Sequence, residues 1–345
     1  MSPTRAAVSP IYPVDELLSQ GELTSAPRQP RANRRPREPR PENPNEIHPQ
    51  IPKRVAKSRL EIVRVPAWNS WSWLLRGFST RTGGATTAYR PTQRSGELNL
   101  GFTASDSREN VIENRRRFLK ALGAPPSMKL VTLKQIHSSS VLSIGERDLS
   151  EAEPCQGDGL ITNQPGILLA IQTADCIPVL IADVKKKAVA AFHAGWRGTV
   201  KRIVESGVGK MRVAFRSRPE DLVAAIGPGI ATCCYAVGED VRTEFVSQFS
   251  YASQLFHEVS DSDPIREKYP MLFLTARAPG HSNLGPSLHL DLMEANRRQL
   301  LDAGLRADAI TVIGDCTRCQ NNRYFSYRAE QGFTGRLLSV IGIRS

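Results

Sequence analysis

The chain has few of the features that mark secreted or membrane proteins. Only six of its 345 residues are cysteine, too few for a disulfide framework, so a reducing compartment is the default. The N-terminus lacks a charged segment followed by an apolar one, which argues against a secretory signal. The most apolar run, 167–182, contains Gln172, Asp175 and Pro178 and is too polar to span a membrane. We therefore expect a cytoplasmic protein without membrane contact.

The first 59 residues have an unusual composition. They hold 11 of the 24 prolines, and eleven Lys and Arg against six Asp and Glu, which is a large part of the total charge of +12. Clustered arginine can neutralise nucleic-acid phosphates. However, Tyr12 is the only aromatic residue there on which a base could stack. Proline and arginine at this density cannot bury enough apolar surface to fold. We predict a disordered tail over 1–59, with a nucleic-acid-binding module acting through this tail as the less favoured, non-enzymatic alternative.

The remaining residues, 60–345, are predicted to form a single catalytic domain. One helix is expected from Ser105 or Ser107, which would cap it, to Gly123, which would end it. A loop is expected over 82–89. Further helices are expected after Gly198 and over 237–249 and 289–304, and strands over 61–65, 74–81, 129–137, 167–172, 177–182, 188–193, 222–226, 309–315 and 337–343. The central runs are apolar throughout, which is typical of strands buried on both faces. The irregular order favours an α/β layered sandwich with one mixed β-sheet system.

Three side chains that can bind metal stand at the ends of these apolar strands. His137 ends the expected strand 129–137, Cys176 lies between two buried runs, and His193 ends the third run. Strand ends often carry sites because the sheet holds them rigidly. Two imidazoles and one thiolate suit Zn²⁺ and leave a fourth position for catalysis. Because the spacing matches no compact zinc finger, two ordinary histidines and a buried cysteine remain the alternative.

Polar residues beside glycines are candidates for binding an anionic substrate. Arg197 follows His193 within HAGWRG, and Arg81 precedes a glycine pair in STRTGG. Asn99 stands in a similar strand-end setting. Glycine lets a ligand approach the backbone closely, and the planar guanidinium suits phosphate or carboxylate. We predict that Arg81, Asn99 and Arg197 bind phosphate or substrate, although a single loop arginine is usually only solvated.

The other cysteines suggest a second arrangement. Cys316 and Cys319 form a CxxC pair that could bind zinc together with Cys233 and Cys234. A lone CxxC lacks the second CxxC that would make this prediction strong. Adjacent cysteines on a strand also point to opposite faces. The sequence therefore argues against a tetracysteine site.

Six motifs resemble a family first described as laccase-domain or multicopper polyphenol oxidase proteins, the YfiH-like family. In chain order they are KQIHS, GDGLIT, TADCIPV, FHAGWRG, AIGPGI…CCYAVG and CTRCQNNRYFSYR…TGR. The resemblance runs from about Arg76 to the C-terminus. Members of the family are regarded as zinc-binding purine nucleoside phosphorylases with some adenosine deaminase activity. The tail over 1–59 lies outside the resemblance.

This resemblance implies a ligand set, a fold and substrates. It implies zinc bound by His137, Cys176 and His193 in a cysteine-hydrolase-toxin-like fold. The expected substrates are adenosine, inosine and methylthioadenosine, with phosphate. Six histidines are too few for the several copper centres of a multicopper oxidase, although one cysteine and two histidines can hold a single copper ion. A copper-dependent polyphenol oxidase therefore stays an alternative, and the sequence predicts no oligomeric state.

The two expected reactions need different groups. Deamination needs hydroxide at adenine C6, which zinc makes available near neutrality, and Asp175 and Asp158 are candidates for proton transfer. Phosphorolysis needs a bound anion and stabilisation of charge on the leaving base. Trp196 and Tyr324–Phe325 offer aromatic faces for a purine, although aromatic residues are more often core.

A cysteine hydrolase is the alternative from another mechanism class. In such an enzyme Cys176 would be the nucleophile, His193 its base, and His137 or Asp175 the orienting group.

Overall fold

Two mixed six-stranded β-sheets form the centre of the computed structural model, which describes residues 11–13, 59–90, 96–145, 155–259 and 287–345. The first sheet has the order β1 (Ile11–Pro13), β5 (Lys129–Val131), β8 (Ile167–Thr173), β15 (Leu337–Ile343), β3 (Leu74–Ser79), β2 (Ile62–Val63). The second has the order β14 (Ile310–Val312), β11 (Leu222–Ile226), β9 (Ile177–Asp183), β10 (Ala188–Ala194), β7 (Gly159–Thr162), β6 (Val141–Ser143). Most neighbours are antiparallel, whereas β5–β8, β6–β7 and β11–β14 are parallel.

The two sheets pack against each other through one shared apolar core. Leu169 and Ile171 of β8 and Ile341 of β15 meet Leu180 of β9 and Ala191 of β10 there. Alternate residues of the same strands face outward into separate helix-covered cores. Burial on both faces explains why these strands are apolar at nearly every position.

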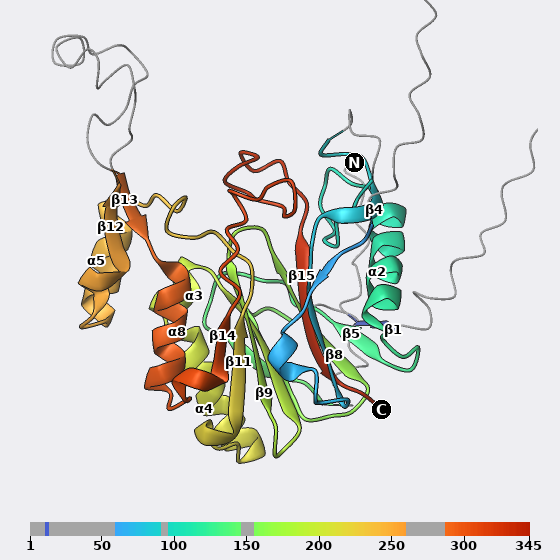
Figure 1. Ribbon diagram of the computed structural model, residues 1–345, viewed down its shortest axis with the longest axis horizontal. Helices are drawn as coiled ribbons and strands as arrows, with labels where there is room; N and C mark the ends of the chain where they lie inside the picture. Colours follow the sequence, from blue (N-terminus) through green and yellow to red (C-terminus); the bar gives the residue numbers. More distant parts are fainter. Residues whose placement is uncertain (1–10, 14–58, 91–95, 146–154, 260–286) are drawn as a thin grey trace, which may run out of the picture.

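Helices cover the outer face of each sheet, which gives a four-layer arrangement (Figure 1). Helix α2 (Arg108–Leu122) covers the first sheet. The second is covered by α3 (Trp196–Val200), α4 (Ile203–Phe215) and α8 (Leu292–Asp302), and α5 (Glu239–Gln248) packs against α3. The remaining elements are β4 (Thr82–Thr86), a ribbon of β12 (Phe256–Val259) and β13 (Ser287–Leu290), and short 3₁₀ helices at Pro66–Trp68, Pro219–Asp221, Ala252–Leu255 and Ala307–Ala309.

The mixed α/β sandwich is confirmed, and so are the ends of α2. The Ser107 hydroxyl accepts a hydrogen bond from the Asn110 N–H at 3.2 Å, and Gly123 ends the helix in the left-handed conformation with φ 75°. The expectation of one sheet system was wrong, because β8 and β9 are consecutive in sequence but belong to different sheets.

Three local predictions also need correction. The expected loop over 82–89 contains strand β4, which bridges to Glu97. The expected strand over 129–137 ends at Val131. The helix expected after Gly198 is two helices, separated at Arg202 by a left-handed backbone with φ 59°.

The expected disordered tail lies mostly outside the described residues. Within it, Ile11–Pro13 forms β1 and pairs antiparallel with β5 at the edge of the first sheet. No helix in the described part of the chain combines the length and apolar character needed to cross a membrane.

Candidate functional site

His137, Cys176 and His193 converge at one end of the sandwich. His137 follows β5, Cys176 lies where the chain crosses from β8 of the first sheet to β9 of the second, and His193 is in β10. Their ligand atoms all lie within 4.8 Å of one another. The Cys176 Sγ is 3.9 Å from the His137 Nε2. Residues far apart in sequence thus form one cluster that uses both sheets.

The direction of His193 follows from strand alternation. Its neighbours Phe192 and Ala194 face the core beneath the helices, so the imidazole faces the opposite side of β10. Only 4% of His193 is exposed. Its Nδ1 lies 2.8 Å from the Oδ1 of Asp158, a fully buried carboxylate just before β7. Because Nδ1 is engaged, Nε2 is left to face the cysteine.

Asp158 also positions His137. Its carboxylate accepts hydrogen bonds from the backbone N–H groups of Ile136, His137 and Ser138, and from the Ser138 hydroxyl at 2.7 Å. His137 has φ 56°, a left-handed conformation that is uncommon for residues other than glycine. Strained backbone of this kind persists only where its surroundings hold it, and it clusters at functional sites. One carboxylate therefore holds the imidazole of His193 and the backbone of His137.

Hydrogen bonds and charges within this cluster shift the pKa values of Asp158, Cys176 and His193. Burial would raise the pKa of Asp158, but hydrogen bonds from His193 and Ser138 lower it to about 2. Burial would also raise the pKa of Cys176, but the charge of His193 and hydrogen bonds from both histidines lower it to about 6. For His193 burial lowers the pKa, whereas Cys176 and Asp158 raise it to about 9. The lowered pKa of Cys176 favours its thiolate, the form that binds metals or attacks substrates.

The donor set fits a zinc ion. Zinc binds thiolate sulfur and imidazole nitrogen tetrahedrally, at bond lengths that place a sulfur and a nitrogen ligand about 3.6 Å apart. The 3.9 Å between Cys176 and His137 is close to this value. The Asp158–His193 pair has the arrangement of the carboxylate–histidine–zinc triads of metalloenzymes. Three protein ligands leave one position open, as catalytic zinc requires.

A cavity of about 630 Å³ opens over this cluster. That volume lies within the usual range for small-molecule sites. Its lining includes all three candidate ligands and three arginines, Arg197, Arg328 and Arg336. Among the described residues, no carboxylate lies within salt-bridge distance of these three guanidinium groups. The cavity therefore combines a metal-binding cluster with positive charge that is available to an anion.

Neighbouring residues hold the arginines in place. The Arg197 guanidinium carbon lies 4.3 Å from the centre of the Trp196 ring. The Arg336 backbone N–H donates to the Asn99 Oδ1 at 2.9 Å. The Arg328 N–H donates to the Asp175 Oδ2 at 2.7 Å, and Asp175 itself has φ 92°. These backbone hydrogen bonds help to fix where two of the guanidinium groups enter the cavity.

Two residues predicted to bind phosphate do not line this cavity. Arg81 is 2% exposed, and its guanidinium pairs with Glu97 and Glu330. Because a buried charge needs such partners, Arg81 joins structural elements instead of facing a ligand. Asn99 is fully buried and acts on the cavity only by holding Arg336.

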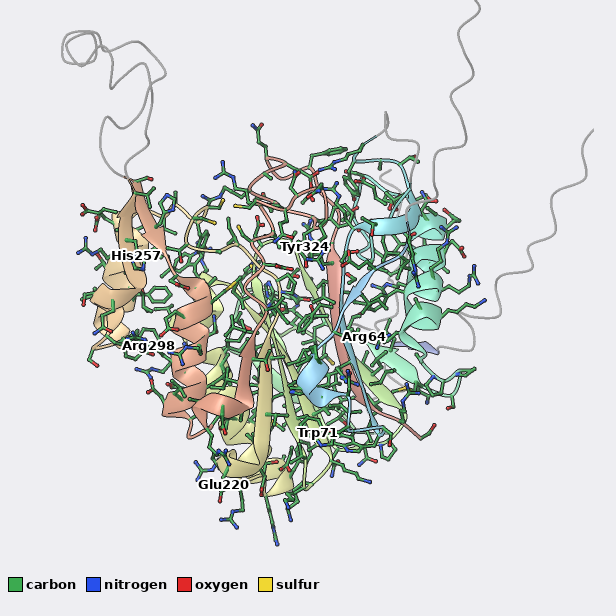
Figure 2. All side chains as sticks on the ribbon, in the orientation of Figure 1. Arg64, Trp71, Glu220, His257, Arg298 and Tyr324 are labelled. Atoms are coloured by element: carbon green, nitrogen blue, oxygen red, sulfur yellow. The ribbon has the colours of Figure 1, made fainter. Side chains whose placement is uncertain are left out.

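The other predicted residues also find places in the structure. Asp158 holds both histidines, and Asp175 lines the cavity while its Oδ1 accepts from the Thr317 hydroxyl at 2.6 Å. Tyr324 and Phe325 are fully buried, and Tyr324 is labelled inside the molecule in Figure 2. They pack in a core with Tyr89 and Leu337 and present no face to a purine.

The cavity residues that the sequence predictions missed include Tyr235, Tyr327, Arg328 and Arg336. The two arginines end the segments SYR and TGR, so their presence in recognisable motifs was a usable indication.

Comparisons with known proteins agree with this architecture. The sequence model described as multi-copper polyphenol oxidoreductase laccase matches residues 75–344. The purine nucleoside phosphorylase YlmD of Geobacillus stearothermophilus is 34% identical over 284 residues, covering 79% of this chain and 94% of that protein. The purine nucleoside phosphorylase YfiH of Escherichia coli (strain K12) is 34% identical over 278 residues, covering 80% and 97%.

A solved structure extends the likeness to three dimensions. The crystal structure of YlmD from Geobacillus stearothermophilus matches with a TM-score of 0.67 at 30% identity, covering 86% of this chain and all of that one. The chain therefore belongs to the laccase-like YfiH family, whose relatives named above are called purine nucleoside phosphorylases.

Proposed function

We propose that this protein is a zinc-dependent purine nucleoside phosphorylase. The observation that carries the proposal is one cavity that holds a His–Cys–His cluster and three arginines, none of which pairs with a carboxylate among the described residues. The names of the relatives support the same activity. The substrates are adenosine, inosine and methylthioadenosine, each cleaved by phosphate to the free base and a pentose 1-phosphate.

The cavity residues divide the work of phosphorolysis. Arg197, Arg328 and Arg336 hold phosphate, because guanidinium groups match its oxygens in charge and geometry. One phosphate oxygen forms a bond to ribose C1′ while the bond from C1′ to the purine nitrogen breaks. The electron pair of that bond leaves with the purine, which takes up a proton.

Tyr235 is placed to assist the leaving base. Burial and the nearby Cys176 thiolate raise the pKa of Tyr235, so its hydroxyl stays protonated. A protonated phenol at the cavity wall can donate a hydrogen bond to a purine nitrogen as negative charge develops there. Its ring, or that of Tyr327, offers the face on which the purine stacks.

His137, Cys176 and His193 would hold zinc, which supplies Lewis acidity. Asp158 fixes the His193 imidazole and the backbone of His137. Deamination of adenosine to inosine and ammonia is a second reaction proposed for the same cavity. Asp158 and Asp175 remain the candidate carboxylates for its proton transfer. Both already accept hydrogen bonds, so their positioning roles come first.

One experiment tests the proposed function directly. The purified protein is incubated with adenosine, with and without phosphate, and the products are separated. Adenine that forms only with phosphate supports phosphorolysis, and inosine that forms without phosphate supports deamination. Neither product, together with phenol oxidation proportional to bound copper, would contradict the proposal in favour of the oxidase alternative.

The geometry also favours a second candidate, a cysteine hydrolase. Cys176, His193 and Asp158 stand in the order of a nucleophile, a base and an orienting acid. The orienting group is Asp158, where the sequence predicted His137 or Asp175. A cysteine nucleophile should survive a strong chelator, whereas a zinc enzyme should not. If iodoacetamide alkylates Cys176 only after metal removal, the zinc assignment is supported. Alkylation at an unchanged rate before chelation would favour the hydrolase.

A further inference from the structure

A second group of metal-binding side chains lies outside the His–Cys–His cluster. It consists of Cys233, Cys234, Cys316 and Cys319, whose sulfur atoms all lie within 4.8 Å of one another. We propose that these four cysteines bind a structural zinc ion as a tetrathiolate. The prediction against a tetracysteine site assumed that Cys233 and Cys234 lie on a strand, where they would point to opposite faces. They lie in a turn instead, so this assumption was wrong.

The distances suit a metal better than disulfides. The Cys319 Sγ lies 3.5 Å from the Cys233 Sγ and 3.3 Å from the Cys234 Sγ. Tetrahedral zinc with four sulfur ligands places neighbouring sulfurs about 3.8 Å apart, whereas a disulfide requires about 2.05 Å. None of the four cysteines is in a disulfide. A small adjustment of side chains would bring all four to one ion.

The local backbone explains how distant cysteines meet. The Cys234 N–H donates to the Ala231 carbonyl at 2.9 Å, which curls the first pair into a turn. The Cys316 Sγ accepts from the Ala231 N–H at 3.5 Å. Backbone N–H groups directed at sulfur help to stabilise thiolate charge. Cys316 and Cys319 have the two-residue spacing common in structural zinc sites.

The burial of the four sulfurs fits a closed structural site. Cys234 and Cys316 are buried, while Cys233 and Cys319 are exposed. The exposed pair gives an entering ion a route, and the buried pair lies beside Ile230 in a small apolar cluster. Because the protein would supply all four ligands, no position is left open for substrate, unlike the site at Cys176.

The position of the site indicates what the ion would do. It would join the turn at 231–235 to the turn at 316–320, which already meet through a bridge between Gly229 and Cys316. The first turn supplies Tyr235 to the cavity wall, and Ile230 just before it also lines the cavity. The second supplies Thr317, whose hydroxyl holds Asp175. The tetrathiolate zinc would therefore stabilise one wall of the binding cavity.

Metal analysis of full-length variants tests this proposal. We expect two zinc ions per chain in the wild type, one in Cys176→Ser and one in Cys316→Ser. Cys155→Ser, a cysteine outside both clusters, is the matched control and should keep both ions. If Cys316→Ser fails to fold, Cys319→Ser at an exposed position replaces it. A zinc content equal to that of the wild type in Cys316→Ser or in Cys319→Ser would overturn the proposal.

Cobalt substitution provides an independent readout. Cys176→Ser loaded with cobalt should show the intense charge-transfer absorption of a tetrahedral tetrathiolate, because the remaining site has four thiolates. In Cys316→Ser the band should be several-fold weaker, since the only intact site there has a single thiolate. No such band in cobalt-loaded Cys176→Ser, or disulfides among the four cysteines in protein purified under reducing conditions, would contradict the assignment.

Discussion

At the scale of single residues, Asp158 is the organising group of the site. Its buried carboxylate accepts from three backbone N–H groups around His137 and holds the Nδ1 of His193. Few side chains other than carboxylates could satisfy so many donors at once. The geometry of the His–Cys–His cluster therefore depends on a residue outside that cluster.

Replacing this carboxylate should weaken metal binding. In Asp158→Asn the amide NH₂ would face N–H donors, so we expect zinc affinity at the His–Cys–His cluster to fall by roughly 10- to 100-fold. Competition with a chromophoric chelator measures this change. Asp183→Asn is the matched control. Asp183 is equally buried, but its carboxylate accepts hydrogen bonds from the backbone N–H groups of Lys185 and Lys186, away from the cavity. Equal affinity in both variants would show that Asp158 does not position the ligands.

A second prediction concerns phosphate binding by the arginines that line the cavity. Arg197→Ala removes one charged donor from the cavity, and a hydrogen bond to a charged group contributes about 1.5–3 kcal/mol. The KM for phosphate should therefore rise roughly 10- to 100-fold, whereas deamination should change little because it needs no bound anion. Steady-state kinetics of both reactions measure the difference. Arg218→Ala, on the exposed surface and paired with Glu220, is the control. Equal losses in both reactions would contradict a role in phosphate binding.

At the scale of elements, Gly195 lets β10 and α3 approach the metal cluster. A Cβ there would stand 2.9 Å from the Cys176 Sγ and 3.1 Å from the His137 Cδ2. Gly195→Ala should therefore weaken zinc binding without removing a ligand, which metal titration would detect. In Gly209→Ala, within α4, a Cβ meets nothing within 4 Å.

The Gly209→Ala variant is the control for Gly195→Ala. Gly209→Ala should keep its zinc affinity and gain about 0.4–1 kcal/mol of unfolding free energy, because alanine restricts the unfolded chain. Chemical denaturation measures the gain. If Gly195→Ala bound zinc as tightly as Gly209→Ala, the close packing around the cluster would not matter for metal binding.

Comparison of elements shows which features the sequence could predict. The ends of α2 follow from local chemistry at Ser107 and Gly123, so they were predictable. Strand β4 was not, because its glycine-rich sequence is held by bridges to Glu97, outside its own segment. The division into two sheets was also not predictable, because the sequence of a strand that is buried on both faces does not indicate which sheet the strand joins.

The residues of the candidate site also include some that the sequence could predict and some that it could not. The His–Cys–His cluster was predictable because its residues stand near the ends of recognisable strands and motifs. Arg81 resembled a ligand-binding loop arginine, but Glu97 and Glu330 from distant segments neutralise it. Arg328 and Arg336 enter the cavity through the long connection before β15, whose path no local pattern describes. Tertiary partners decide such roles.

At the scale of the whole molecule, we propose that the catalytic domain begins near residue 60, with β1 as an added edge strand. Deleting residues 1–58 removes only the three-residue pairing of β1 with β5 from the described structure. We expect nucleoside phosphorolysis to survive this deletion, with a small loss of stability. Any salt-sensitive binding of nucleic acid should disappear with the arginine-rich segment. Kinetics and binding at low salt check both outcomes, and loss of turnover would show that the domain boundary is misplaced.

The central claim is that one cavity joins a zinc site to phosphate binding. Phosphorus NMR of the protein with adenosine and phosphate follows ribose 1-phosphate directly, first in zinc-loaded protein, then after chelation, then after zinc is restored. The account predicts that the ribose 1-phosphate signal grows in the first sample, stops in the second and resumes in the third. Undiminished formation of ribose 1-phosphate by the metal-free protein, or none by the zinc-loaded protein, would contradict it.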